Sequence, residues 1–202
     1  MLEGGEIPML RPNKQQRWSW AIALGLGLGS TVVPGALAVR LRDGKVHFVQ
    51  PPSLVSATTT RNEASAWSAT YYFTVAVPEN ADEPLGQLML EQREGVDTLR
   101  YRLGETFAYE GGDRQRLIAV GEVTQDLSQR RVTVTFDPPV EPGRTVTLGL
   151  RPVRNPRYDG VYLFGVTAVP AGDNPQSQFL GYGRLHFYGG SDLYLWRGYP
   201  WY

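Results

Sequence analysis

Residues 70–77 read Thr70-Tyr71-Tyr72-Phe73-Thr74-Val75-Ala76-Val77. Aromatic and β-branched side chains dominate this segment, and such residues favour extended strands. Successive side chains of a strand point to opposite faces, so Tyr71, Phe73 and Val75 share one apolar face. Pro78 ends the strand because proline has no N–H to donate to a neighbouring strand. The segment is therefore predicted to be a strand with one face in the core.

The same two-residue period returns in the second half of the chain. Apolar and threonine residues alternate from Val132 to Phe136, and apolar residues again occupy every second position from Val146 to Leu150. Pro142-Gly143 is a turn dipeptide between these segments, which are therefore predicted to form a hairpin. Residues 160–169 are apolar on both faces, which predicts a central strand that is covered on both sides.

Shorter segments extend this pattern towards both ends of the chain. Further strands are predicted at residues 45–49, 85–91, 97–103, 117–123 and 179–188. Residues 56–65 are polar and are predicted to form a loop, whereas residues 104–112 favour no single conformation. About eight or nine short strands, joined by turns roughly every 8–12 residues, are typical of an all-β, immunoglobulin-like two-sheet β-sandwich. A closed barrel is the alternative.

The N-terminal segment has the order of features found in a secretory signal peptide. Basic residues precede an apolar run, a Pro-Gly pair follows it, and small residues then occupy a cleavage site. These features are Arg11, Lys14 and Arg17, residues 18–29, Pro34-Gly35 and Ala36-Leu37-Ala38. Residues 1–38 are therefore predicted to be a signal-peptide helix, and residues 39–188 the β-sandwich domain. The alternative is an uncleaved membrane anchor, although Pro34 and several glycines dilute the apolar run.

Composition narrows the location and the partners. The chain has no cysteine, so it can carry neither a disulfide nor a lipid on a cysteine. Export without disulfides is ordinary for a bacterial envelope protein, and the predicted location is the periplasm or cell envelope. Twenty basic residues balance twenty acidic ones, and such a chain has no long-range field to attract nucleic acid. Membrane contact is expected only through an uncleaved signal peptide.

Several segments, taken in order, resemble the cyanobacterial family known as domain of unknown function 2808. They are Tyr72-Phe73, residues 77–81, Pro84-Leu85, residues 136–140, Pro142-Gly143, Leu150-Arg151-Pro152, Arg154-Asn155-Pro156, residues 160–166, Pro170-Ala171-Gly172 and residues 180–188. The resemblance extends from about Val46 to Tyr188, nearly the whole predicted mature chain. It implies an exported envelope protein with one β-rich domain, and it assigns no catalytic or ligand-binding residue.

Metal binding has few candidates in this sequence. Copper and zinc sites need two or three imidazole or sulfur ligands held close together. His47 and His186 are the two histidines, and the apolar residues on either side of each predict that both face solvent. They are weak candidates for a copper site, and no metal or cofactor is predicted.

Catalysis is not predicted either. The sequence has no Gly-x-Ser-x-Gly motif and no cysteine nucleophile. Glu105, Glu110 and Asp113 could supply a pair of carboxylates for glycoside hydrolysis, but carboxylates in loops are usually solvated charges. The protein is therefore predicted not to be an enzyme.

Aromatic side chains could provide planar surfaces for stacking on sugar rings. One candidate is Trp67, and the others lie in the aromatic tail at residues 189–202: Tyr194, Trp196, Tyr199, Trp201 and Tyr202. The favoured alternative places Trp67 in the core and folds the tail over an open sheet edge.

Three arginines are spaced three residues apart in a segment broken by prolines: Arg151, Arg154 and Arg157. In a polyproline conformation this spacing aligns them on one face. There they could bind an anionic group or, as is commoner in loops, pair with nearby carboxylates.

These observations favour a non-catalytic binding or structural module of the cell envelope. Its expected partner is another envelope protein or a wall polymer. The alternatives are a periplasmic copper-handling protein and a carbohydrate-binding or carbohydrate-active protein.

Overall fold

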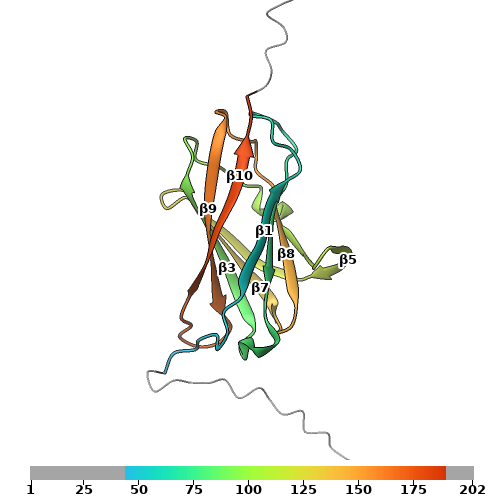
Figure 1. The fold of residues 1–202 in the computed structure, drawn as a ribbon, viewed down its shortest axis with the longest axis vertical. Helices are drawn as coiled ribbons and strands as arrows, with labels where there is room; N and C mark the ends of the chain where they lie inside the picture. Colours follow the sequence, from blue (N-terminus) through green and yellow to red (C-terminus); the bar gives the residue numbers. More distant parts are fainter. Residues whose placement is uncertain (1–43, 190–202) are drawn as a thin grey trace, which may run out of the picture. The chain divides into compact units, whose positions relative to one another are not determined.

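The computed structural model describes residues 44–189, which form two β-sheets packed face to face (Figure 1). Neighbouring strands within each sheet are antiparallel. Sheet 1 has the order β1 (Ser53–Thr59), β2 (Tyr71–Ala76), β8 (Thr145–Leu150), β4 (Phe107–Glu110) and β5 (Asp113–Ile118). Sheet 2 has the order β10 (Gln178–Phe187), β9 (Gly160–Pro170), β3 (Leu85–Glu94), β7 (Arg131–Val140) and β6 (Val120–Asp126). The prediction of an all-β, immunoglobulin-like two-sheet β-sandwich is confirmed.

Two short 3-10 turns, η1 (Glu79–Ala81) and η2 (Leu103–Glu105), lie in the connections between these strands. Each of these helical turns among residues 44–189 has three residues, far too few to span a bilayer. The predicted signal peptide, residues 1–38, lies outside the described residues. So does the predicted aromatic tail, except for Gly189.

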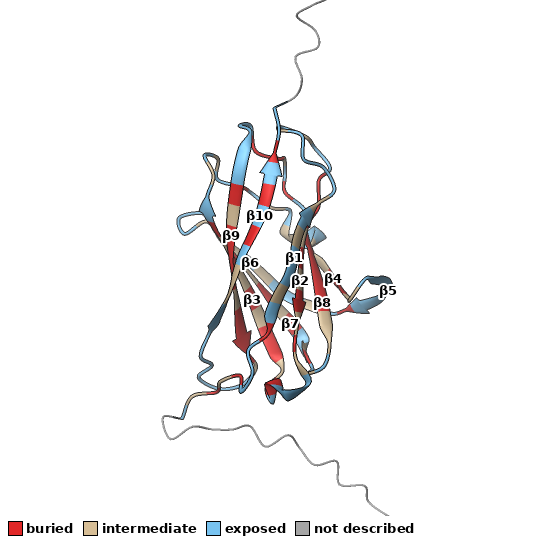
Figure 2. Cartoon of the chain, viewed as in Figure 1, coloured by how far each residue is buried: buried red, intermediate tan, exposed pale blue. Residues whose placement is uncertain are grey.

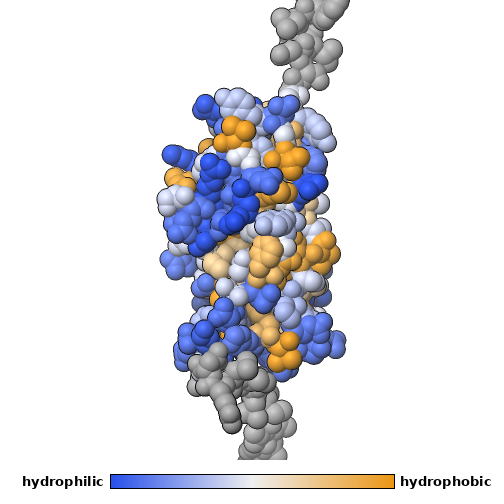
Figure 3. All heavy atoms as spheres, turned by 60° about the vertical axis from the view of Figure 1, so that its left-hand side comes forward, coloured by the Kyte–Doolittle hydropathy of each residue, from blue (hydrophilic) through white to orange (hydrophobic). Residues whose placement is uncertain are grey.

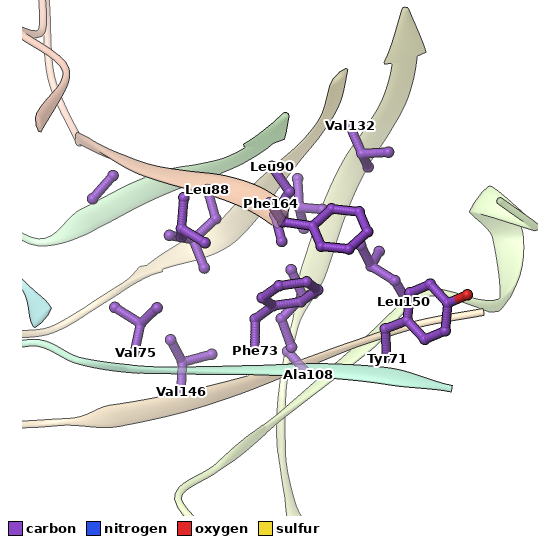
Figure 4. Close-up of a cluster of buried hydrophobic side chains, with 14 of the residues drawn as sticks. Tyr71, Phe73, Val75, Leu88, Leu90, Ala108, Val132, Val146, Leu150 and Phe164 are labelled. Atoms are coloured by element: carbon purple, nitrogen blue, oxygen red, sulfur yellow. The ribbon is translucent and has the colours of Figure 1, made fainter. Parts of the chain in front are cut away.

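The core lies between the two sheets and is built from alternate residues of their strands (Figure 2). In β2 the residues Tyr71, Phe73 and Val75 have no exposed surface, as their alternation predicts. Phe164 of sheet 2 packs against Phe73 of sheet 1, with ring centres 5.6 Å apart in an edge-to-face arrangement (Figure 4). The aromatic residues of β2 therefore join the two sheets across the middle of the core.

The predicted hairpin between residues 132–136 and 146–150 is wrong. β7 pairs with β3 and β6 in sheet 2, whereas β8 pairs with β2 and β4 in sheet 1. Pro142 and Gly143 do form a turn, and the Gly143 N–H donates to the Val77 carbonyl at 3.0 Å. This turn carries the chain from one sheet to the other. Alternation cannot separate these two cases, because a hairpin and a corner between sheets both place every second residue in the core.

Four other segments also differ from their predictions. Residues 117–123, predicted to be one strand, are divided between the end of β5 in sheet 1 and the beginning of β6 in sheet 2. Residues 53–59, mostly predicted to be a loop, form β1, whose side chains are exposed or only partly buried. An edge strand with so little burial carries a weak apolar signal. Residues 45–49 and 97–103 were predicted to be strands, yet each is limited to an isolated bridge, between Val46 and Pro175 and between Tyr101 and Pro152.

β9 occupies the central position that was predicted for it, between β10 and β3. Its inner face, with Tyr162, Phe164 and Val166, is buried. The opposite face is covered only in part, because Val161 is 39% exposed. The prediction of cover on both sides was therefore wrong at the beginning of this strand.

A buried carboxyl group lies in the connection between η1 and β3. Glu83 is 5% exposed, and its Oε1 has no hydrogen-bond partner among residues 44–189. Burial and the neighbouring carboxylate of Asp82 raise the pKa of Glu83 above its usual value. Ionised Glu83 therefore opposes folding.

Replacing Glu83 by glutamine is expected to stabilise the protein at neutral pH. A raised pKa in the folded state means that wild-type stability falls as pH rises through and above the ordinary glutamate value of 4.5. The Glu83→Gln variant should therefore match the wild type in acid well below that value. At pH 7 it should be more stable by roughly 1 kcal/mol, because it removes an unpaired buried charge. Urea unfolding at both pH values measures the difference.

The matched control is Glu79→Gln, which removes an exposed carboxylate from the preceding turn. This variant should change stability little at either pH. A Glu83→Gln variant that is less stable than the wild type at pH 7 would show that the carboxylate is needed in its charged form.

Candidate functional site

Three loops meet at the end of the sandwich where β2 begins and where β3, β8 and β10 end. They are residues 60–70, 95–102 and 151–159. Between them lies a cleft of about 500 Å³. Its lining includes Trp67, Asp97, Leu99, Arg100, Arg154 and Arg157. Loops held by a rigid sandwich are the usual place for binding residues in this architecture.

Asn155 ties two of these loops together from the inside. It is 2% exposed, and its Nδ2 donates to the carbonyl oxygens of Arg61 and Glu63, at 3.1 and 2.9 Å. Its Oδ1 accepts a hydrogen bond of 2.9 Å from the Tyr71 hydroxyl. Burial raises the pKa of Tyr71 far above its usual range, so this phenol keeps its proton and remains a donor. Asn155 therefore fixes the position of one wall of the cleft relative to the core.

Gln92 of β3 holds the 95–102 loop, which forms a second wall of the cleft. It is 6% exposed, and its Nε2 donates to the Asp97 carbonyl at 2.6 Å. Its Oε1 accepts the backbone N–H of Leu99 at 3.2 Å. A buried amide whose oxygen and nitrogen are both bonded holds a loop more firmly than exposed contacts do. The segment that carries Asp97 and Leu99 is thereby attached to the sheet.

Trp67 stands at the rim of the cleft and is 61% exposed. The backbone on either side of it is held in place, because the Asn155 N–H donates to the Ala66 carbonyl and the Ser65 N–H donates to the Pro156 carbonyl, at 2.8 and 2.7 Å. The guanidinium carbon of Arg154 lies over the indole ring, 5.7 Å from its centre. The expectation that Trp67 belongs to the core was therefore wrong. The loop is anchored by its backbone, and the indole points outwards.

Charged side chains surround the indole on the other walls of the cleft. Arg100 and Arg157 are exposed, and Arg154 is half-buried. Asp97 supplies the carboxylate on the lining, and this carboxylate accepts the backbone N–H of Arg157. The cleft therefore combines a flat aromatic surface with an excess of positive charge.

Arg151 does not share this cleft, although the three-residue spacing predicted it on one face with the other two arginines. Its guanidinium lies 3.0 Å from a carboxylate oxygen of Glu105 and 5.7 Å from the centre of the Phe107 ring. It lines a separate, smaller hollow. The structure thus brings Arg154 and Arg157 together and places Arg151 in an ion pair. Trp196 and Trp201, the other predicted binding residues, lie outside the described residues.

The two histidines are far apart. His47 is half-buried next to Val46, which bridges to Pro175 ahead of β10, whereas His186 is exposed near the other end of β10. At about 3.3 Å per residue along a strand, roughly 30 Å separate them. His186 faces solvent as predicted, but His47 is partly covered. In the described part of the chain, no group of three or more His, Cys, Asp or Glu side chains is placed to hold a metal ion.

The candidate carboxylates for glycoside hydrolysis are held by other groups. Glu105 pairs with Arg151, and Glu110 accepts two hydrogen bonds from Arg144, at 3.2 and 3.0 Å. The hydrogen bonds from Arg144 lower the pKa of Glu110, whereas a general acid needs a raised pKa. Asp113 accepts a backbone N–H in the turn that begins β5. Two of these carboxylates are therefore held in ion pairs with arginines, and the third is held in a turn.

Exposed apolar surface is scattered over the sandwich. Figure 3 shows one face, where hydrophobic residues form separate groups among hydrophilic ones. The large exposed hydrophobic side chains come from different segments and include Val55, Val96, Leu117 and Phe179. Phe179 packs against the exposed Tyr182, with ring centres 5.1 Å apart. Small exposed groups of this kind need no functional explanation. The cleft at the loop end is therefore the more informative surface.

The fold and the cleft define an immunoglobulin-like β-sandwich that carries a cationic, aromatic cleft on the loops at one end. The chain belongs to the family described as Protein of unknown function (DUF2808), whose sequence model matches residues 45–187. No curated protein sequence matches this chain.

Solved structures resemble the fold at low sequence identity. The N-terminal domain of the Streptococcus gordonii adhesin Sgo0707 is 19% identical with a TM-score of 0.44, and the match covers 71% of this chain and 34% of that chain. BcpA, the major pilin subunit of Bacillus cereus, is 12% identical with a TM-score of 0.42, over 68% of this chain and 41% of that chain. The collagen-binding subdomain of the Enterococcus faecalis surface protein ACE is 5% identical with a TM-score of 0.40, over 68% and 98%. This chain thus spans less than half the length of the first two.

Proposed function

We propose that this protein is a non-catalytic binding module, exported to the periplasm or cell envelope, that holds a wall polymer in the cleft. The observation that carries the proposal is the exposed indole of Trp67 at the rim. The signal-peptide pattern of residues 1–38 supports export.

The exposed indole fits a sugar better than it fits the interior of the protein. A pyranose ring has an apolar face and polar edges, and an indole that is open to solvent offers a matching flat surface. Trp67 leaves 61% of its surface uncovered, although the backbone on both sides of it is hydrogen-bonded to the 151–157 segment. The backbone that carries this side chain is thus held in place before a ligand binds, which lowers the entropic cost of binding.

A polymer is favoured over a protein partner by the size of the cleft and by its surroundings. A volume of about 500 Å³ suits a short stretch of a chain molecule. A stable protein interface needs roughly 800 Å² of surface from each partner. On the one face that Figure 3 shows, hydrophilic residues lie between the hydrophobic groups, whereas the centre of a protein interface is mostly apolar.

Replacing Trp67 by alanine is expected to weaken polymer binding by about tenfold or more, because exposed aromatic anchors commonly supply over 1 kcal/mol of binding energy. The assay uses full-length protein and the insoluble polymer fraction of the native envelope, and it measures the protein that sediments with the polymer. Thermal unfolding of the variant should be nearly unchanged, since the indole is exposed.

The matched control is Tyr182→Ala, which removes an aromatic residue of similar exposure, 56%, from β10. This variant should sediment like the wild type, and an equal loss in both variants would contradict the assignment to the cleft. Pretreating the envelope fraction with protease tests the partner, because binding that disappears after proteolysis would indicate a protein instead.

Export is tested in native cells, where the proposed mature chain begins at Val39. Recovery from the cytosol of a chain that still begins at Met1 would contradict it.

A further inference from the structure

We infer that the polymer held by this cleft is an acidic polysaccharide whose sugar rings carry carboxylates. This inference rests on the proposed function and names the class of ligand. It follows from the arginines of the cleft, from their lack of carboxylate partners, and from their position beside Trp67.

Most arginine–carboxylate pairs of the described region lie away from the cleft. The arginines with a carboxylate oxygen within ion-pair distance are Arg93, Arg102, Arg116, Arg131, Arg144 and Arg151. Among residues 44–189, no carboxylate makes an ion pair with Arg100, Arg154 or Arg157. The three arginines that line the cleft are thus among those whose guanidinium groups make no ion pair within residues 44–189, and they are distinguished from the other such arginines by sharing one cleft.

The charge of the cleft is positive. Three arginines and one acidic residue, Asp97, belong to its lining. Asp97 is already engaged, because its carboxylate accepts the backbone N–H of Arg157. Guanidinium groups remain protonated at all ordinary pH values. Like charges gathered around a hollow attract an anion, and the attraction is stronger there than on a flat surface.

The arrangement of the groups selects a carboxylated sugar over a small anion. Arg154 lies over the indole with its guanidinium carbon 5.7 Å from the ring centre. Arg154 covers one face of the indole, so a pyranose would stack on the other face, where a carboxylate at its ring edge could meet the arginines of the lining. The planar fork of arginine matches a carboxylate with two parallel hydrogen bonds. Arg157 and Arg100 on the other walls would then meet the next charged units of the chain.

The test compares two polymers that differ only in charge. Polygalacturonate carries a carboxylate on each ring, and its fully methyl-esterified form has the same backbone without the charges. Full-length protein is titrated with each polymer by calorimetry. We expect polygalacturonate to bind at least about tenfold more tightly than the ester, because each lost charge-assisted contact weakens binding by such a factor. Equal binding of the two polymers would overturn the inference.

The variant Arg154→Gln/Arg157→Gln should lose this preference, so that it binds polygalacturonate no more tightly than it binds the ester. The matched control is Arg184→Gln, which removes an exposed arginine of β10 that also lacks a carboxylate partner among residues 44–189. The control should bind polygalacturonate like the wild type. An equal loss in the control would mean general charge attraction and would overturn the inference. Thermal unfolding of each variant confirms that it is folded.

Two further outcomes separate this inference from the proposed function. If Trp67-dependent sedimentation with the envelope polymer persists but polygalacturonate binds no better than its ester, the polymer is neutral and only this inference fails. If the wild type binds neither polygalacturonate nor the envelope polymer, both fail. Polyphosphate is titrated as a third polymer. If it binds more tightly than polygalacturonate, the cleft prefers phosphate groups, and the inference of a carboxylated polysaccharide is overturned.

Discussion

The Asn155→Ala variant is expected to lose about 2–4 kcal/mol of unfolding free energy. The substitution removes three side-chain hydrogen bonds at once, and it leaves the Tyr71 hydroxyl and the carbonyls of Arg61 and Glu63 without this partner. Buried polar groups that lose a partner cost more than the bond itself contributes. For a domain of this size the melting temperature should fall by roughly 5–15 °C. Urea and thermal unfolding measure both quantities.

The Tyr71→Phe variant separates the parts of this effect. It keeps the buried ring and removes only the hydroxyl that donates to Asn155, so it should cost about 1 kcal/mol. The Tyr71→Phe/Asn155→Ala double variant should lose less unfolding free energy than the two single variants lose together, because both substitutions remove the same hydrogen bond. Strict additivity would contradict the bond between these side chains. The Asn155→Ala variant should also weaken polymer binding, since the loop of Trp67 loses its internal support.

The Phe164→Ala variant is expected to lose about 3–5 kcal/mol. Phe164 is 2% exposed and contacts Phe73 and Tyr71 of the opposite sheet, with ring centres 5.6 and 6.2 Å apart (Figure 4). Truncation removes apolar contacts with both rings and leaves a cavity between two rigid sheets, which cannot close completely around it. Equilibrium unfolding in urea measures the loss.

Phe179→Ala is the control for this core variant. Phe179 lies on the neighbouring strand β10 but is 49% exposed, and its removal should change stability by less than about 1 kcal/mol. Similar losses in the two variants would contradict the position of the core between the sheets. Unchanged stability in Phe164→Ala would contradict the contact between sheets on which the fold depends.

The strands that alternation predicted are those with one deeply buried face. β2 and β9 are examples, because their inner residues are apolar, bulky and covered by the other sheet. β1 could not be predicted in this way, since as an edge strand it buries little and its sequence is mostly polar. The pairing of β7 and β8 was also beyond the local pattern, because partners are chosen by contacts between distant segments. Fold class was therefore predictable, and strand order was not.

The cleft was predictable only in part. The spacing of Arg154 and Arg157 pointed to one surface, and the structure places both on the same lining. The exposure of Trp67 depends on hydrogen bonds from Asn155 to a loop some 90 positions earlier in the chain, with separations of 92 and 94 residues. No sequence motif marked Asp97 or Arg100 as part of a site. They lie on the cleft because Gln92 holds their loop against the sheet. Such long-range polar contacts have no periodic signature.

The points where the chain enters and leaves the described domain lie at opposite poles (Figure 1). Val46 bridges to Pro175 just before β10, and Tyr188 bridges to Glu63 just after it. A pulling force applied between residues 44 and 189 would thus act along β10, across the hydrogen bonds that join it to β9. These bonds would be sheared together instead of being peeled apart one by one. Unfolding by a force between these two ends is consequently expected to need a larger force than pulling that peels β10 from β9 one hydrogen bond at a time.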